Sequence, residues 1–145
     1  MKSKLLNPGP ERTYAVVLEP GDEAMEALQR FAVQESLNAS RVSAIGAFER
    51  AELGYFEIDR KDYLRIPVDA QVEVLSLVGD VALDGGKPKL HLHAVLGRRD
   101  GSTVGGHLLS GVVRPTLEVL VTESPGYLRK TWDARFGLAL IDPAA

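Results

Sequence analysis

The stretch LHLHAVLGRRDGSTVGGHL, from Leu90 to Leu108, holds every histidine of the 145-residue chain. His91 and His93 lie two residues apart in an alternating run, and side chains at i and i+2 of a strand project from the same face. Residues 98–102 have the composition of a hairpin turn, and the strand that follows carries His107. The stretch therefore predicts two antiparallel strands whose register decides whether the third ring joins the first two.

Two turns are compatible with this hairpin. A two-residue loop, Asp100-Gly101, would place His107 opposite Ala94 and turn its ring to the other face. A three-residue loop over 99–101, in which Gly101 takes the left-handed position of a G1 bulge, would place His107 opposite His93. All three rings would then share a face.

The hydrophobic pattern favours the three-residue loop. A slip of one residue moves every side chain of a strand to the other face, so the register with a continuous apolar layer is preferred. The three-residue loop gives such a layer, made of the leucines at 90, 92 and 96 together with Val104 and Leu108. We therefore expect that register, although Gly105-Gly106 could host a further bulge.

Three neutral imidazoles that converge on one point form a binding site for Zn²⁺ or another divalent transition metal, with a coordination position left for water or substrate. Three histidines could equally fill polar positions on a half-exposed sheet face, and His-x-His alone is a weak signal. Cysteine is absent, which excludes disulfides, thiol nucleophiles and every cysteine-containing metal site. Any metal, with zinc the first candidate, is therefore expected at His91, His93 and His107.

The remaining sequence predicts a mostly antiparallel β-sheet with one main helix, an α/β (α+β) fold. Pro20-Gly21-Asp22 supplies a helix start, and the apolar stripe of Leu28, Phe31 and Ala32 continues to about Leu37. Strands are expected at 13–18, 41–48, 52–58, 70–82, 89–97, 103–110, 116–123 and 134–141. Residues 63–67 and 124–133 are expected to be connections.

The chain is expected to form a single domain. The two prolines and the glycine of Asn7-Pro8-Gly9-Pro10 disfavour regular pairing, so residues 1–12 are predicted to be an extended N-terminal arm. The domain itself would cover 13–141, and 142–145 would be a tail. No composition shift or internal repeat indicates a second domain.

Charge and hydropathy exclude several classes of function. Lys and Arg number 17 against 20 Asp and Glu, so the net charge is −3, and tight direct binding to nucleic acid is not expected from global charge. No stretch approaches the roughly 18 apolar residues of a membrane span, and no signal peptide is recognisable. We expect a cytoplasmic protein without a membrane partner.

Carboxylates and arginines supply the remaining candidates. Glu118 could orient a metal ligand or accept a proton from a metal-bound water, or it could be a solvated strand residue, and Glu73 has the same ambiguity. Arg98, Arg99 and Arg114 could attract a small anionic ligand, although arginines in such turns are more often solvent-exposed residues without a ligand. The larger aromatic side chains show no stacking platform for nucleic acid and are expected in the core or an interface: Tyr14, Tyr55, Phe56, Tyr63 and Trp132.

The strand Leu90–Gly97, the Asp100-Gly101 turn and the Gly105-Gly106-His107 segment resemble the PPC domain, the plant and prokaryote conserved domain also called domain of unknown function 296. The stretches 45–48, 52–56, 72–79, 115–119 and 136–140 resemble its other strands. The resemblance covers about Thr13 to Ile141, nearly the whole chain.

This resemblance implies a sandwich-like fold, a homotrimer and, in prokaryotic members, a bound metal, usually zinc, whose ligands here would be His91, His93 and His107. In land plants the domain follows an AT-hook in DNA-binding proteins, but the short N-terminal segment here has no Arg-Gly-Arg-Pro core, so a direct DNA role does not carry over. The leading hypothesis is a metal-binding homotrimer, with catalysis undecided and Glu118 a helper if it occurs. The alternative is a regulatory interaction module that contacts DNA only through partners.

An oligomer is also expected from the strands themselves. The segments 70–82 and 116–123 are apolar on nearly both faces, whereas one helix covers only one face of a sheet. Exposed apolar surface of this kind marks subunit interfaces, and a closed threefold ring would cover it.

Overall fold

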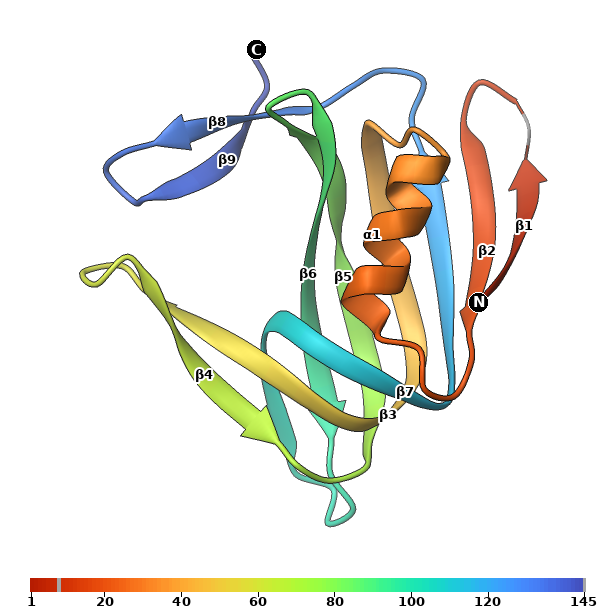
Figure 1. The fold of residues 1–145 in the computed structure, drawn as a ribbon, viewed down its shortest axis with the longest axis vertical. Helices are drawn as coiled ribbons and strands as arrows, with labels where there is room; N and C mark the ends of the chain where they lie inside the picture. The colour runs from red at the N-terminus through yellow and green to blue at the C-terminus, as the bar shows by residue number, and fades with distance from the viewer. Residues whose placement is uncertain (8, 145) are drawn as a thin grey trace.

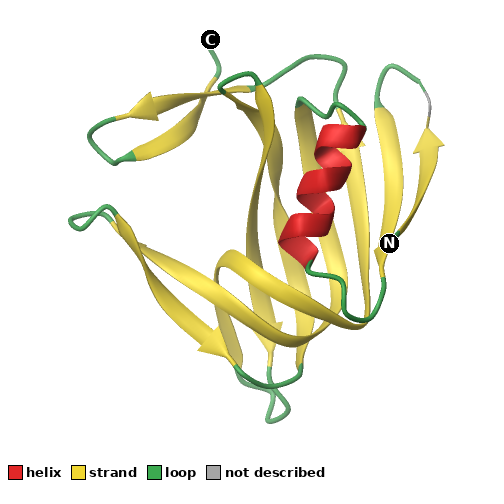
Figure 2. Cartoon of the chain, in the orientation of Figure 1, coloured by secondary structure: helices red, strands yellow, loops and turns green. Residues whose placement is uncertain are grey.

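An antiparallel sheet with one helix against one of its faces makes up the structure, a computed structural model that describes residues 1–7 and 9–144 (Figures 1 and 2). The described elements are, in chain order, β1 (Lys2–Asn7), β2 (Arg12–Leu18), α1 (Ala24–Gln34), β3 (Ala39–Glu57), β4 (Asp62–Val68), β5 (Val72–Asp84), β6 (Lys87–Gly97), β7 (Thr103–Glu123), β8 (Arg129–Asp133) and β9 (Leu138–Asp142). The predicted α+β fold, mostly antiparallel with one main helix, is confirmed. The short parallel contact between β5 and β8 is the exception to the antiparallel pairing among the described strands.

The helix α1 begins where the sequence predicts and ends before the predicted limit. The Glu23 carboxylate accepts a hydrogen bond from the Glu26 backbone amide at 2.7 Å and so caps the first turn. The buried face carries the predicted stripe, which includes Leu28 and Phe31. The helix ends at Gln34 rather than near Leu37, because the chain enters a left-handed conformation two residues later, at Ser36 (φ 53°). At 11 residues, α1 is too short to cross a bilayer, and no helix in the described ranges could do so.

Two long strands replace four predicted short ones. β3 joins the segments expected at 41–48 and 52–58, and β7 joins those expected at 103–110 and 116–123. Their mutual register shifts at several points, so the irregular stretches are bulges within continuous strands rather than turns. The first half of β7 pairs with β6, whereas the second half pairs with β2.

Three other predictions about the elements were wrong. The expected arm of residues 1–12 is not unpaired, because β1 forms an antiparallel ladder with β2; Pro8 lies outside the described residues. The expected connection at 63–67 is the edge strand β4, which pairs with β3 and tolerates Pro67 for that reason. The expected connection 124–133 contains β8, and the strand expected at 134–141 is β9, which extends to Asp142 of the predicted tail.

The hydrophobic core lies between α1 and the sheet. Leu28 and Phe31 of the helix pack over Val42, Leu90 and Val121 from three different strands. The core therefore holds the leucine face of β6, and the alternate residues of β6, which include two of the histidines, project from its other face.

The face of the sheet opposite α1 retains exposed apolar side chains. Five of them are between 42% and 61% exposed, and we call this set the outer apolar face: Ile45, Leu75, Val78, Val95 and Leu120. The sheet therefore carries apolar side chains on its outer face as well as on its core face, as the sequence predicted.

Candidate metal centre

The three histidines lie on adjacent strands in the register that the hydrophobic pattern favoured. β6 and β7 are paired from Gly97 with Thr103 to His93 with His107. The turn is the three-residue loop, since Gly101 is left-handed (φ 82°) and the Arg98 amide donates to the Ser102 carbonyl oxygen at 2.8 Å. The register prediction is confirmed, and His107 lies directly across from His93.

The imidazole rings form a compact cluster. Ring centroids are 5.0 Å apart for His91 and His93, 5.1 Å for His91 and His107, and 5.3 Å for His93 and His107. One nitrogen from each ring can be chosen so that all three lie within 4.8 Å of one another. The Nε2 atoms of His91 and His93 are 3.1 Å apart, close to the roughly 3.3 Å expected for two nitrogens bound to one tetrahedral zinc ion. The donor set therefore fits a single zinc-sized ion.

The carboxylate of Asp80 lies beside Nδ1 of the His91 ring. It lies opposite His91 in the β5–β6 ladder, and its Oδ2 atom is 3.4 Å from His91 Nδ1. Its Oδ1 atom is 3.1 Å from Nζ of Lys130, whose side chain is only 6% exposed. A carboxylate on Nδ1 leaves Nε2 free to bind a metal and fixes the orientation of the ring.

The electrostatics of the cluster keep two of the rings neutral. Burial, together with the neighbouring imidazoles and the charges of Lys130 and Lys89, lowers the pKa of His107 to about 4. Burial and the proximity of His91 also lower the pKa of His93. Burial alone would raise the pKa of Asp80, but the adjacent His91 ring and the charge of the adjacent Lys130 ammonium hold it below its usual value. Neutral imidazoles beside an ionised carboxylate are the forms that bind a metal.

His107 is the most enclosed of the three rings. The Tyr63 ring from β4 stacks on it, with centroids 4.8 Å apart and an angle of 27° between the planes. The Nδ1 atom of His107 is buried and has no hydrogen-bond partner among the described residues. A polar atom that is buried and unpaired costs free energy, and a bound ligand would remove that cost.

A cavity of about 340 Å³ adjoins the histidines. It opens where β6 and β7 stop pairing, beyond His93 and His107. Its walls come from α1, β4, β5, β6, β7, β8 and β9, and the side chains are Met25, Tyr63, Asp84, Lys89, Leu90, His91, His107, Leu108, Leu109, Lys130 and Ala139. The two hairpins β3–β4 and β8–β9 project from the same side of the sheet (Figure 1). Their tips are joined by a hydrogen bond of 2.7 Å from Lys61 Nζ to the Ala134 carbonyl oxygen.

The carboxylates singled out from the sequence lie elsewhere. Glu118 faces Ile45 across the β3–β7 ladder and lines a separate hollow with Leu75 on the outer apolar face. Glu73 lines the same hollow. Neither carboxylate is among the residues that line the histidine cavity.

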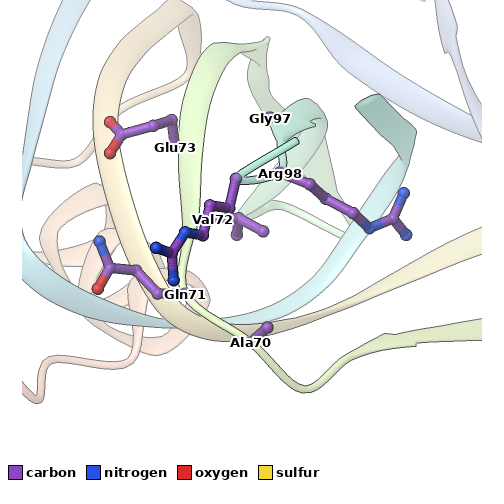
Figure 3. A pocket seen from close by; sticks show the side chains of 7 residues that line it. Ala70, Gln71, Val72, Glu73, Gly97 and Arg98 are labelled. Atoms are coloured by element: carbon purple, nitrogen blue, oxygen red, sulfur yellow. The ribbon is translucent and has the colours of Figure 1, made fainter. Parts of the chain in front are cut away.

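The arginines are also remote from the histidines. Arg98 and Arg99 lie at the β6–β7 turn and line a cavity of about 520 Å³ with Glu73, whose charged end points away from that of Arg98 (Figure 3). This cavity is larger than the one beside the histidines, but no histidine lines it. Arg114 lies 3.9 Å from Glu49 in an exposed ion pair.

The aromatic residues are divided between core and surface. Tyr14 is buried against Phe31, as a core residue should be. Tyr55 and Trp132 are 64% and 68% exposed on the projecting hairpins. Tyr63 is the aromatic residue that belongs to the candidate site, a role that the sequence did not indicate.

The sequence analysis missed Asp80 and Lys130, for different reasons. The turn at Gly85-Gly86 pairs Asp84 with Lys87, and counting back along both strands from this pair places Asp80 opposite His91. That signal was present. Lys130 arrives through the parallel contact of β8 with β5, for which no local pattern exists.

The chain is similar to a known protein family and to several solved structures. The family model of the Plants and Prokaryotes Conserved (PCC) domain matches residues 6–125. A crystal structure of a metal-containing protein from Archaeoglobus fulgidus is similar with a TM-score of 0.83 and 30% identity, covering 97% of this chain and 96% of that one. A plant- and prokaryote-conserved (PPC) protein from Pyrococcus horikoshii has a TM-score of 0.85 and 30% identity, with 97% and 94% covered.

Curated relatives share the domain as part of a longer protein. The bifunctional protein GlmU of Synechococcus sp. (strain JA-3-3Ab) is 35% identical over 121 residues. The match covers 82% of this chain, but only 18% of that relative. The chain thus corresponds to about a fifth of that protein's length.

Proposed function

Because the chain belongs to the Plants and Prokaryotes Conserved (PCC) domain family, we propose that it is a metal-binding protein in which His91, His93 and His107 hold one divalent ion, with zinc preferred. The observation that carries the proposal is the cluster itself: three imidazoles from paired strands with one nitrogen each within 4.8 Å. The description of the Archaeoglobus fulgidus neighbour as metal-containing supports it.

The chain's own residues prepare this site. Asp80 orients His91, and burial keeps His93 and His107 in the neutral form that binds metal. An ion held by three imidazoles supplies a Lewis acid with at least one open coordination position. The proposal is limited to binding and leaves catalysis undecided; Glu118, the carboxylate expected to assist catalysis, does not line the cavity.

We further propose that the protein is a homotrimer. The outer apolar face supports an association through this surface, since its side chains are 42–61% exposed in the single chain. A threefold ring would bury this face in a closed set of identical contacts. The trimer should not depend solely on the metal, because one chain supplies all three imidazoles, although His93 projects from the same face of the sheet as Val78 and Val95.

Element analysis of purified protein without a histidine-rich tag tests the metal proposal. After dialysis against zinc and then against metal-free buffer, one ion per chain is expected. The variant with His91→Ala, His93→Ala and His107→Ala should retain none. A matched pair of carboxylate variants sharpens the result: Asp80→Asn should weaken zinc binding, whereas Glu118→Gln should leave it unchanged. Full zinc content in the triple variant would contradict the assignment of the metal site.

A second candidate function is an interaction module that contacts DNA only through partner proteins. A similar structure from Ralstonia eutropha JMP134 is described as a putative DNA-binding protein (TM-score 0.82, 27% identity), and the outer apolar face could hold a partner. The net charge of −3 argues against direct contact with phosphates. Tight, AT-selective binding of duplex DNA by the isolated chain at physiological salt would contradict this part of the proposal.

A further inference from the structure

We propose that the cavity beside the three histidines binds a small organic anion, with its carboxylate at the histidine end and a short apolar body toward the β8–β9 hairpin. The inference rests on the proposed metal site and names the class of ligand that such a site would take. Three features of the cavity carry it: the charged side chains that line it, the apolar side chains that line it, and the volume.

The histidine end of the cavity favours an anion. Lys89 and Lys130 line it together with His91 and His107. Asp80 and Asp84 balance these two lysines, so a divalent ion on the histidines would leave an excess of two positive charges. A site with this excess, partly shielded from water, attracts a negatively charged group.

The other walls of the cavity favour an organic ligand over an inorganic one. Met25 from α1, Leu109 from β7 and Ala139 from β9 line the same space with apolar side chains. A hydrated inorganic anion would gain nothing from these side chains, whereas a short hydrocarbon body would bury surface against them.

The volume limits the ligand to a small molecule. About 340 Å³ is near the lower end of the roughly 300–1,000 Å³ found for ligand sites. The hydrogen bond from Lys61 to Ala134 ties the two hairpins that contribute Tyr63 on one side and Ala139 on the other. A contact between the two hairpins restricts their relative motion, which reduces the entropy cost of binding.

The test uses the full-length protein loaded with Co²⁺, whose visible absorption spectrum reports on the coordination of the ion and requires no enzymatic assay. Acetate, butyrate and hexanoate are titrated at fixed pH and ionic strength, with inorganic phosphate and hexylamine in parallel, and binding is followed by absorption and by calorimetry. The carboxylates should shift the spectrum, and affinity should rise by up to about fourfold for each methylene buried. Hexylamine should not bind, and phosphate should bind no more tightly than acetate.

Matched variants locate the two ends of the ligand. Ala139→Leu should fill the apolar end and remove the gain from acetate to hexanoate, while Ala144→Leu, at an exposed position outside the cavity, should leave the gain unchanged. Lys89→Ala should weaken all three carboxylates by about threefold, as for the loss of one exposed ion pair, whereas Lys87→Ala on the same strand should not. Acetate binding that survives in Ala139→Leu shows that the variant is folded.

The outcomes separate this inference from the metal proposal. If Co²⁺ binds in a one-to-one ratio but no carboxylate changes the spectrum or the heat, the ligand inference is wrong and the metal site stands. If phosphate binds as tightly as hexanoate, or affinity is independent of chain length, the site does not select organic anions and the inference is overturned. If Co²⁺ itself does not bind, the proposed function fails first and the ligand inference with it.

Discussion

Replacing Asp80 with asparagine should separate two roles that this carboxylate holds. One oxygen lies 3.4 Å from His91 Nδ1 and the other 3.1 Å from Lys130 Nζ. The asparagine side chain would keep an oxygen near the ring but lose the charge. We expect weaker zinc binding, by about 10- to 100-fold, because the partner that orients and polarises His91 is lost.

The same substitution should destabilise the metal-free protein through Lys130. At 3.1 Å and an effective dielectric constant of 20, the Coulomb energy of the pair is about 5 kcal/mol. Desolvation of both groups offsets part of this, and the Asp80 side chain is 25% exposed, so the loss in unfolding free energy should be about 3 kcal/mol. Most of that cost comes from leaving the buried ammonium without a counter-charge.

A second variant distinguishes the two effects. Adding Lys130→Met to Asp80→Asn removes the unpaired charge, so the unfolding free energy should recover most of the loss while zinc affinity stays weak. Urea denaturation in the presence of a chelator measures the first quantity, and competition with a chromophoric chelator measures the second. Zinc affinity equal to that of the wild type in Asp80→Asn, with the fold intact, would refute the orienting role.

Three further predictions concern pH, assembly and a buried carboxylate. Zinc competes with protons for imidazole, and the lowered pKa values of His93 and His107 (about 4 for His107) keep those ligands neutral. Zinc affinity, measured by chelator competition, should therefore decline mainly below about pH 6.5. A steep loss of affinity between about pH 8 and 7 would contradict this prediction. Light scattering should report about three times the 15.7 kDa chain mass before and after chelation. The variant Leu120→Arg, on the outer apolar face, should give monomers. The control variant Val33→Arg, at an equally exposed position on α1, should remain a trimer. Glu123 is 3% exposed and accepts hydrogen bonds from two backbone amides and a serine hydroxyl. The variant Glu123→Ala should lower the unfolding free energy, measured by urea denaturation, by about 2–3 kcal/mol. An unchanged denaturation midpoint would show that these bonds do not stabilise the fold.

The histidine hairpin was predictable because two independent signals agreed. The alternation of leucine and histidine in 90–93 defines which face is apolar, and Gly101 supplies the left-handed residue that a three-residue turn needs. The same reasoning applied to the turn at Gly85-Gly86 would have found Asp80. Registers of local hairpins follow from short-range patterns, so this half of the site is contained in the sequence.

The other half of the site depends on contacts that have no local pattern. β4 carries Tyr63 but is mostly exposed, so it lacks the alternation that marks a half-buried strand. β8 brings Lys130 to Asp80 through two paired residues of a parallel contact, which no turn specifies. The continuous course of β3 and β7 was also hidden, because bulges interrupt the periodicity without ending the strands.

Anomalous scattering from crystals of the zinc-loaded, untagged protein tests the central claim most directly. Data collected on both sides of the zinc absorption edge should show one strong peak per chain at the centre of the His91, His93 and His107 rings, and no peak in crystals of the triple alanine variant. A peak at any other group of side chains, or none in protein that contains zinc by element analysis, would contradict the assignment.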